Sequence, residues 1–228
     1  MTYLFEPSAI PSLPIAGDDR RFPVRRIFCI GRNYADHARE MGATVDRGQP
    51  VFFTKPTDAL VSDGRDVPYP QATTLLHHEV EMVIALGAGG RDIAVDKADQ
   101  LVFGHAVGLD LTRRDLQALA KKGGLPWDAA KGMDHGAPVS AITPISAGAP
   151  MPDTTLSLHV NGKLRQQTRL DAMLWNVPEI IAGLSALFEL HAGDLIFTGT
   201  PAGVGPLLRG DTFHAQLHGI ATLDGRIA

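Results

Sequence analysis

The hydrophobic positions of this chain fall mainly into short apolar runs separated by turns rich in glycine and proline. The runs lie at residues 24–30, 51–54, 75–86, 101–111 and 195–198. Short apolar runs bounded by turn residues are typical of buried strands. Asn161-Gly162, between an alternating segment at 156–160 and Leu164, is a strong signal for a two-residue β-hairpin turn. The pattern therefore predicts a fold in which strands dominate.

Helical periodicity is limited to three short segments, 34–41, 113–122 and 178–190. The second ends at Gly123-Gly124, and helices commonly end at glycine. The third has the most regular apolar face, which consists of Ile181, Leu184, Leu187 and Phe188. Short helices among many strands predict a β-dominated α+β fold with the helices at its periphery.

The first 23 residues differ from the rest because they hold four prolines and little periodicity. We expect residues 1–23 to form an extended N-terminal arm and residues 42–50 to form a loop. No repeat or low-complexity segment divides the remainder. We therefore expect residues 24–228 to form a single domain, which would carry any catalytic site.

Composition excludes several classes of protein. The formal net charge of −4 over 228 residues leaves no basic footprint for nucleic acid or an anionic membrane. No apolar run reaches the roughly 18 residues of a membrane span, and no export signal opens the sequence. Cys29 is the single cysteine, which excludes an internal disulfide framework and suits a reducing compartment. We expect a cytoplasmic protein without nucleic-acid or membrane partners.

Acidic residues interrupt the apolar run at 75–86 in the sequence HHEVEM. Side chains alternate along a strand, so Glu79 and Glu81 are expected on one face and His78 on the other. Asp110 ends the next apolar run, in which Gly104 and Gly108 predict close packing. Three carboxylates suit a hard cation such as Mg²⁺ or Mn²⁺, whereas an isolated Glu-x-Glu pair is more often a solvated strand face.

A second candidate lies in GRNYADHARE, where His37 and Glu40 are neighbours on a helix. Glu40 can orient the imidazole so that it acts as a general base on water. Spacing alone favours an ordinary surface pair. A third set of polar side chains, Arg114, Gln117 and Lys131, follows Asp110 and offers donors for carboxylate or enolate oxygens.

The sequence GTPAGVG, which follows the last apolar run, lacks the ending of a phosphate-binding loop. Residues 87–90, GAGG, do not match a dinucleotide fingerprint either. Nucleotide binding is therefore rejected. A tight turn that presents Thr200 to a ligand remains open.

In this order, the motifs resemble the fumarylacetoacetate hydrolase family. The matching blocks are IFCIGRNYADHAREMG, FFTKPTDALV, HHEVEMVIALG, VFGHAVGLDLTRRDLQ, GLPWDAAKGMD, HVNGKLRQQTRLDAMLWN and GDLIFTGTPAGVG. The resemblance covers roughly residues 24–211. It implies a mixed β-sandwich roll of the kind found in the C-terminal domain of that family, and a homodimer. Within the family, the acylpyruvase branch, which includes fumarylpyruvate hydrolases, is the most similar.

The resemblance also implies a role for each candidate residue. Glu79, Glu81 and Asp110 would bind Mg²⁺ or Mn²⁺, and His37 with Glu40 would activate water. Lys131 would stabilise an oxyanion. The residues expected to hold the substrate are Arg32, Arg114, Gln117 and Thr200. Two departures stand out: His78 replaces a tyrosine common in relatives, and APVSAI replaces a P-[IVL]-G turn.

The activity implied is metal-dependent hydrolysis of the C–C bond of an acylpyruvate, with fumarylpyruvate giving fumarate and pyruvate. Decarboxylation of oxaloacetate and isomerisation or decarboxylation of diacids from aromatic catabolism remain open, because all of them use a metal-stabilised enolate. A non-catalytic protein that binds oxo-acids is a further alternative. The candidate base pair argues against it, since binding alone needs no base.

Overall fold

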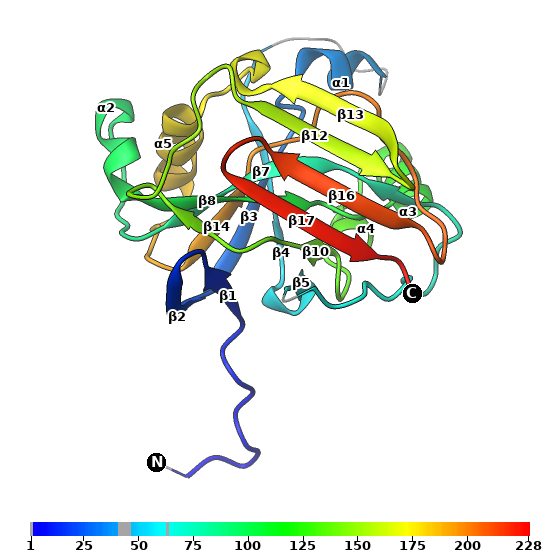
Figure 1. The fold of residues 1–228 in the computed structure, drawn as a ribbon, viewed down its shortest axis with the longest axis horizontal. Helices are drawn as coiled ribbons and strands as arrows, with labels where there is room; N and C mark the ends of the chain where they lie inside the picture. Colours follow the sequence, from blue (N-terminus) through cyan, green and yellow to red (C-terminus); the bar gives the residue numbers. More distant parts are fainter. Residues whose placement is uncertain (1, 41–46, 63) are drawn as a thin grey trace.

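The computed structural model describes residues 2–40, 47–62 and 64–228 (Figure 1). Most of the chain forms a sandwich of a six-stranded and a four-stranded sheet, with short helices at its edges. The β-dominated α+β fold predicted from the sequence is thus confirmed. None of the helices in the described residues is long and apolar enough to cross a membrane.

The six-stranded sheet has the order β11-β8-β7-β14-β3-β4, and its neighbours are antiparallel except for β14 and β3. Its strands are β3 (Arg26–Gly31), β4 (Val51–Lys55), β7 (Val80–Leu86), β8 (Val102–Leu109), β11 (Thr143–Pro144) and β14 (Asp194–Phe197). Central strands of such a sheet are buried on both faces, which explains why their sequences read as continuous apolar runs.

The four-stranded sheet is antiparallel, in the order β13-β12-β16-β17. Its strands are β12 (Thr155–Val160), β13 (Lys163–Arg169), β16 (Thr212–Leu217) and β17 (Ala221–Arg226). Asn161 and Gly162 connect β12 to β13 with φ angles of 50° and 72°, which confirms the predicted hairpin turn. One core lies between the two sheets and includes Met82, Leu158 and Ala215.

Smaller pairings complete the sheets. A three-stranded sheet contains β6 (Leu76–His78), β9 (Thr112–Arg113) and β15 (Gly205–Pro206), and β5 (Leu60–Val61) pairs with β10 (Ala137–Pro138). The apolar run at 75–86 therefore forms two strands in different sheets, with Glu79 at the break. The sequence predicts one strand there, because no glycine, proline or other turn residue interrupts residues 75–86 to mark the break.

The helices are α1 (Ala35–Glu40), α2 (Val95–Ala98), α3 (Arg114–Gly123), α4 (Asp128–Lys131) and α5 (Val177–Leu187), with short 3₁₀ turns at Thr57–Ala59, Asp99–Leu101 and Leu170–Ala172. Gly124, in the left-handed region at φ 63°, ends α3 as predicted. The end predicted for the first helix, and residues 42–46 of the predicted loop, lie outside the described residues.

Helix α5 differs from its prediction at the C-terminal end. Asn176 and Glu179 form a capping box at its start, and Ile181 and Leu184 are buried as predicted. Leu187 is 64% exposed, however, and Phe188 has left the helix. The helix ends early because Leu190 instead exchanges two backbone hydrogen bonds with Gly90.

The N-terminal segment is an extended arm only over residues 2–11. A hairpin follows, formed by β1 (Ser12–Ile15) and β2 (Asp18–Pro23), and Leu13 and Phe22 are buried against the outer face of the six-stranded sheet. Cys29 lies in the same core. The sequence obscures this hairpin because prolines and charged residues occupy most of its outward positions.

Candidate active site

The three carboxylates predicted to share a site are brought together at one point of the six-stranded sheet. Strands β7 and β8 are antiparallel neighbours, so the start of one lies beside the end of the other, with Val80 opposite Leu109. Glu79 and Glu81 flank Val80, and Asp110 follows Leu109. The backbone N–H of Asp110 donates to the carbonyl of Glu79 over 2.8 Å, which fixes the two strand ends together.

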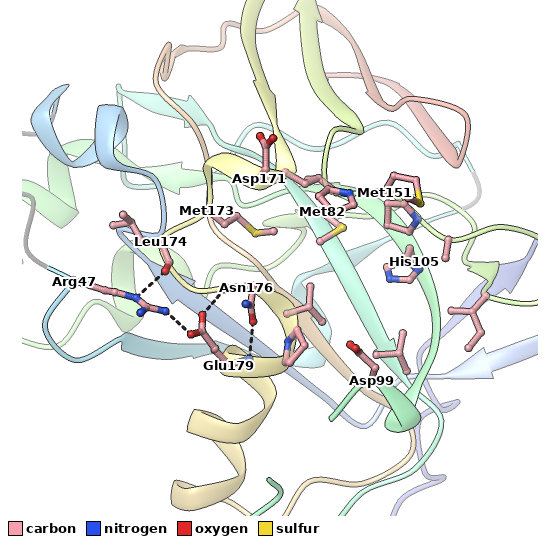
Figure 2. A pocket seen from close by; sticks show the side chains of 18 residues that line it. Arg47, Met82, Asp99, His105, Met151, Asp171, Met173, Leu174, Asn176 and Glu179 are labelled. Atoms are coloured by element: carbon pink, nitrogen blue, oxygen red, sulfur yellow. Dashed lines mark hydrogen bonds and ion pairs between the residues drawn. The ribbon is translucent and has the colours of Figure 1, made fainter. Parts of the chain in front are cut away.

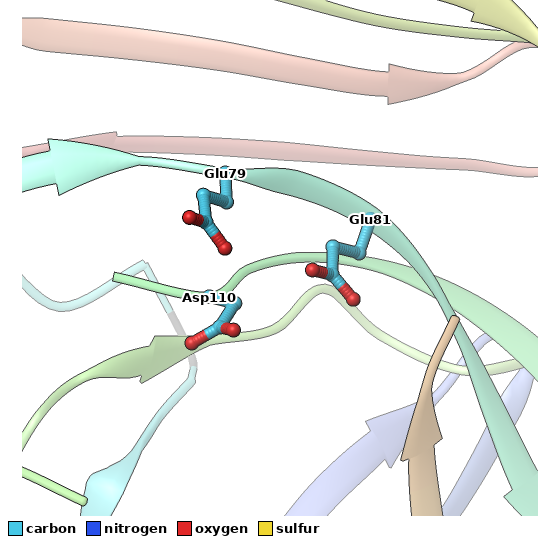
Figure 3. Close-up of side chains that lie close together, drawn as sticks. All are labelled: Glu79, Glu81 and Asp110. Atoms are coloured by element: carbon cyan, nitrogen blue, oxygen red, sulfur yellow. The ribbon is translucent and has the colours of Figure 1, made fainter. Parts of the chain in front are cut away.

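Carboxylate oxygens of Glu79, Glu81 and Asp110 lie within 4.8 Å of one another, and all three side chains are buried (Figure 3). The parity argument is therefore confirmed for Glu79 and Glu81. It is also confirmed for His78, whose Nδ1 lies 2.9 Å from Gln166 Oε1 and not in the carboxylate cluster.

Glycines allow the backbone to approach this cluster closely. Gly108 lies opposite Glu81, and a Cβ there would come within 2.9 Å of the Phe197 ring. Gly199, at φ 92°, donates its N–H to Glu81 Oε2 over 2.7 Å, and a Cβ there would come within 2.7 Å of Asn33 Cβ. These positions require glycine, so the close approach expected for the β8 run is real.

Buried cations surround the carboxylates. Lys131, at the end of α4, lies 2.7 Å from Glu79 Oε2 and 2.6 Å from Asp110 Oδ2. Arg114 contacts Glu79 Oε1 and donates to Gln117 Oε1 over 2.6 Å. Burial opposes ionisation of Glu79, but the charges of Lys131 and Arg114 outweigh it and lower its pKa. Burial also opposes the charge of Lys131, yet Asp110 and Glu79 raise its pKa, so it stays cationic.

Glu81 has no such cation at hydrogen-bond distance among the described residues. Burial, followed by the charges of Asp110 and Glu79, raises its pKa well above the ordinary value. Asp110 Oδ1 is buried without a hydrogen bond of acceptable geometry, although Lys55 Nζ lies 2.8 Å away. An all-oxygen donor set in which Glu81 lacks a cationic partner fits a hard divalent cation such as Mg²⁺ or Mn²⁺.

The predicted base pair lies on α1. His37 is 8% exposed, and its Nδ1 is 3.4 Å from Glu40 Oε2. The N–H of Gly203 donates to both carboxylate oxygens of Glu40 over 3.2 Å, which connects α1 to the GTPAGVG turn. Burial lowers the pKa of His37, so its imidazole is neutral near pH 7 and can accept a proton.

Thr200 and Arg32, the other two predicted substrate ligands, are not part of the hydrogen-bonded group that Arg114 and Gln117 form beside Glu79. The Thr200 hydroxyl donates to the carbonyl of Val80 and accepts from Gln166 Nε2, at 2.9 and 2.8 Å. Its one O–H is therefore already used, which leaves an acceptor lone pair. Arg32, at φ 62°, is exposed and makes no contact with the carboxylates within the described part of the chain.

Two buried groups of this site were not singled out from the sequence. The phenol oxygen of Tyr34 is buried without a hydrogen-bond partner among the described residues. Burial and then the charge of Glu81 raise its pKa, so it is a neutral donor. Lys55 is the second of these buried groups. The sequence signal that points to it is a lone lysine in the apolar segment VFFTKP.

Lys55 anchors the loops that carry the site. Its fully buried ammonium donates to the carbonyls of Leu111, Lys131 and Gly136 at 3.2, 2.6 and 3.0 Å, besides facing Asp110. It therefore holds both the third carboxylate and the helix that presents Lys131.

Replacing Lys55 with methionine is expected to lower the free energy of unfolding by about 3–5 kcal/mol, because Asp110 and buried carbonyls lose their partner. Urea denaturation in the presence of EDTA measures this. Lys163→Met, at an exposed position of β13, is the matched control and should change stability by less than about 0.5 kcal/mol. A loss below about 1 kcal/mol in Lys55→Met would contradict the anchoring role.

A pocket of about 710 Å³ is lined by residues other than the three carboxylates (Figure 2). Met82, adjacent to Glu81 and therefore pointing the other way, lines it together with His105 and residues at the start of α5. His105 is 7% exposed, and its Nδ1 has no hydrogen-bond partner among the described residues.

Burial lowers the pKa of His105 from 6.5 to about 4. The unfolded chain therefore binds this proton first, and stability is lost as pH falls from about 6.5 towards 4. This group contributes about 3 kcal/mol of that loss. Denaturation at a series of pH values should show a shallower loss in His105→Leu than in the parent; equal slopes would contradict the assignment.

Comparison with known proteins identifies the family. The family model for the fumarylacetoacetate (FAA) hydrolase C-terminal domain matches residues 26–228. A fumarylpyruvate hydrolase of Ralstonia sp is 43% identical over 185 residues, which cover 80% of this chain and 96% of that protein. Human mitochondrial oxaloacetate tautomerase FAHD1 is 40% identical over 203 residues, 89% of this chain and 91% of that protein.

A solved structure is similar over its whole length. The crystal structure of fumarylpyruvate hydrolase from Pseudomonas aeruginosa, in complex with Mn²⁺ and pyruvate, is 44% identical and has a TM-score of 0.97. The match covers 100% of this chain and 99% of that one. The chain belongs to the fumarylacetoacetate hydrolase family.

Proposed function

We propose that this enzyme is a divalent-metal-dependent hydrolase that cleaves the C–C bond of an acylpyruvate, with fumarylpyruvate as its substrate and fumarate and pyruvate as products. The observation that carries the proposal is the convergence of three buried carboxylates with a buried histidine, which is paired with Glu40, and a buried lysine. Fumarylpyruvate hydrolases of two bacteria support the choice of substrate, since one is 43% identical and the other 44%.

The metal ligands in this proposal are Glu79, Glu81 and Asp110. A bound Mg²⁺ or Mn²⁺ would supply Lewis-acid polarisation of the keto acid and offset the charge of the departing enolate. The Pseudomonas aeruginosa structure contains Mn²⁺ together with pyruvate, which is one of the two proposed products.

Charge balance supports an anionic substrate. With every group ionised, the three carboxylates are balanced in charge by Lys55, Lys131 and Arg114, which contact Glu79 and Asp110. A divalent cation would then leave the site with two excess positive charges. A dianion such as a diacid, or a monoacid that ionises to its enolate, would neutralise them, and a neutral diketone would not.

The protein groups have separate roles in the proposed reaction. Neutral His37, held by Glu40, takes a proton from water, and the water oxygen adds to the distal carbonyl carbon. The ammonium of Lys131 donates to the oxyanion that forms. The C–C bond then breaks, its electron pair stays with the pyruvate fragment as an enolate, and a proton from the medium or His37 completes pyruvate.

The substrate would be held by the groups around this centre. Arg114 and Gln117 present donors beside Glu79, and the GTPAGVG turn with Thr200 borders Glu81. We include Arg32 as a ligand for the distal end of the substrate, since it is exposed immediately after β3 and two residues before Tyr34. A homodimer in the cytoplasm is part of the same proposal.

Oxaloacetate chemistry is the second candidate, because oxaloacetate tautomerases are 40% identical over about nine-tenths of their length. The test is a panel of fumarylpyruvate, acetylpyruvate and oxaloacetate, each with Mg²⁺ and with Mn²⁺. We expect kcat/KM for pyruvate release from fumarylpyruvate to exceed that for every reaction of oxaloacetate by at least tenfold. A higher value for tautomerisation or decarboxylation of oxaloacetate would replace the proposal, and tight oxalate binding without turnover would indicate a binding protein.

A further inference from the structure

The N-terminal arm, residues 2–11, extends away from the body of the protein below β1 and β2 (Figure 1). It carries four large apolar side chains that face solvent in the isolated chain. Tyr3 is 63% exposed, Leu4 88%, Phe5 80% and Ile10 72%. Exposed termini are usually polar, so an arm with three adjacent large apolar side chains and a fourth nearby marks a binding surface.

The body of the same chain does not hold the arm in place. Within the described residues, the hydrogen bond that joins them is at the base of the arm, where Val24 N–H donates to the carbonyl of Pro11 over 2.8 Å. The arm has no secondary structure of its own, and Pro7 and Pro11 favour an extended backbone. Its composition is not that of a disordered tail either, since four of its ten residues are large and apolar.

The arm nevertheless belongs to the shared architecture of related proteins. The match to the Pseudomonas aeruginosa fumarylpyruvate hydrolase takes in the whole of this chain, the arm included, at a TM-score of 0.97. A segment with so few contacts to its own body does not keep a common placement by itself. The surface that covers it therefore belongs to another molecule.

We propose that, within the homodimer proposed above, on which this inference rests, the N-terminal arm of each chain packs against the body of the second copy, so that the two copies exchange arms. Ten extended residues reach about 33–36 Å, which is enough to cross from one body onto another. In a two-fold dimer both arms are covered at once, and their aromatic and aliphatic side chains together bury on the order of 1,000 Å². That approaches the area of a stable interface before any contact between the two bodies is added.

The test uses the full chain and two arm variants in sedimentation equilibrium over a wide range of concentrations. One variant lacks residues 2–11, and the other carries Leu4→Ser with Phe5→Ser. We expect the parent to dimerise and both variants to have a dimer dissociation constant at least a hundredfold higher. The matched control, Thr2→Ala with Ser8→Ala, keeps the length and the apolar side chains of the arm and should dimerise like the parent.

The arm variants should fold normally, because the arm contributes little to its own body; circular dichroism checks this. A monomeric parent would overturn both the proposed homodimer and the exchange of arms, whereas the arm variants test the exchange alone. A dissociation constant that changes less than threefold when the arm is removed would overturn the exchange, because the bodies would then dimerise without it. A lower melting temperature of the arm-less chain at an unchanged mass would also overturn it, since the arm would then bind its own body.

Discussion

Replacing His37 with alanine is expected to lower kcat by about 10²–10⁴-fold while leaving the affinity for Mn²⁺ within a factor of about two. His37 is a buried imidazole that interacts electrostatically with Glu79, and Glu40 lies 3.4 Å from one of its nitrogens. Burial keeps it neutral, which is the form that accepts a proton from water. Steady-state kinetics on the best substrate of the panel, with Mn²⁺ affinity measured by calorimetry, separates the two effects.

The pH profile gives a second readout of the same residue. Because the folded-state pKa of His37 lies below 6.5, kcat/KM should hold through neutral pH and fall only in the acid range below that value. The fall in kcat/KM at acid pH that protonation of His37 causes should be absent from the residual activity of His37→Ala. His214→Ala, which removes a half-exposed histidine of β16 paired with Asp224, is the matched control and should leave kcat unchanged. Near-normal turnover of His37→Ala with Mn²⁺ bound would exclude His37 as the base.

Glu40→Gln tests the positioning of that base. The amide keeps the size of the side chain and one acceptor oxygen, but it loses the charge that favours the protonated imidazole. We expect an intermediate fall in kcat, on the order of tenfold, with the acid limb of the profile moved to lower pH. An unchanged profile would show that the 3.4 Å contact has no influence on the reaction.

Local patterning was sufficient to predict the centre of this site. Alternation along a strand put Glu79 and Glu81 on one face, and it put His78 on the other, where its ring meets Gln166. The position of Asp110 depends on which strands are neighbours, which alternation does not reveal. Asp110 was grouped with the two glutamates because it ends the next apolar run, the resemblance to a family added support, and the antiparallel pairing of β7 with β8 explains the contact.

Residues whose environment is built by distant segments were harder to predict. Lys55 is fully buried because loops around Leu111, Lys131 and Gly136 all turn their carbonyls towards it. The local segment VFFTKP marks Lys55 as unusual, but it does not encode these distant partners. The same holds for the break at Glu79, since no turn residue separates β6 from β7 and the break follows from their different partner strands.

Short-range signals also failed where a longer-range contact ended a helix or paired a hairpin. The periodicity of α5 continues to Phe188, but Leu190 takes its hydrogen bonds from Gly90, so the last apolar positions leave the helix. Leu13 and Phe22 pair across β1 and β2 and are buried by the outer face of the large sheet. In each case tertiary contacts decided the structure.

Replacing Lys131 with methionine is expected to lower kcat by about 10²–10³-fold, the loss typical of removing one donor to an oxyanion. The same substitution should tighten Mn²⁺ binding. In the metal-free protein the Lys131 ammonium lies 2.7 Å from Glu79 Oε2 and 2.6 Å from Asp110 Oδ2, so it is a like charge beside two of the proposed metal ligands. Removing that charge lowers the electrostatic cost of placing a divalent cation between them.

The two expected effects, a lower kcat and tighter Mn²⁺ binding, have opposite signs. This combination distinguishes a catalytic role of Lys131 from a purely structural one. If Lys131 served only to hold Glu79 and Asp110 in place, its loss would weaken Mn²⁺ binding and turnover together. Calorimetric titration with Mn²⁺ and steady-state kinetics on the same preparation therefore test the oxyanion role. Lys122→Met, at an exposed position near the end of α3, is the matched control for loss of a lysine and should change neither quantity by more than about twofold. A parallel fall in Mn²⁺ affinity and kcat in Lys131→Met would assign the lysine to the structure of the metal site and leave the oxyanion to another donor, for which Arg114 and Gln117 are the nearest groups.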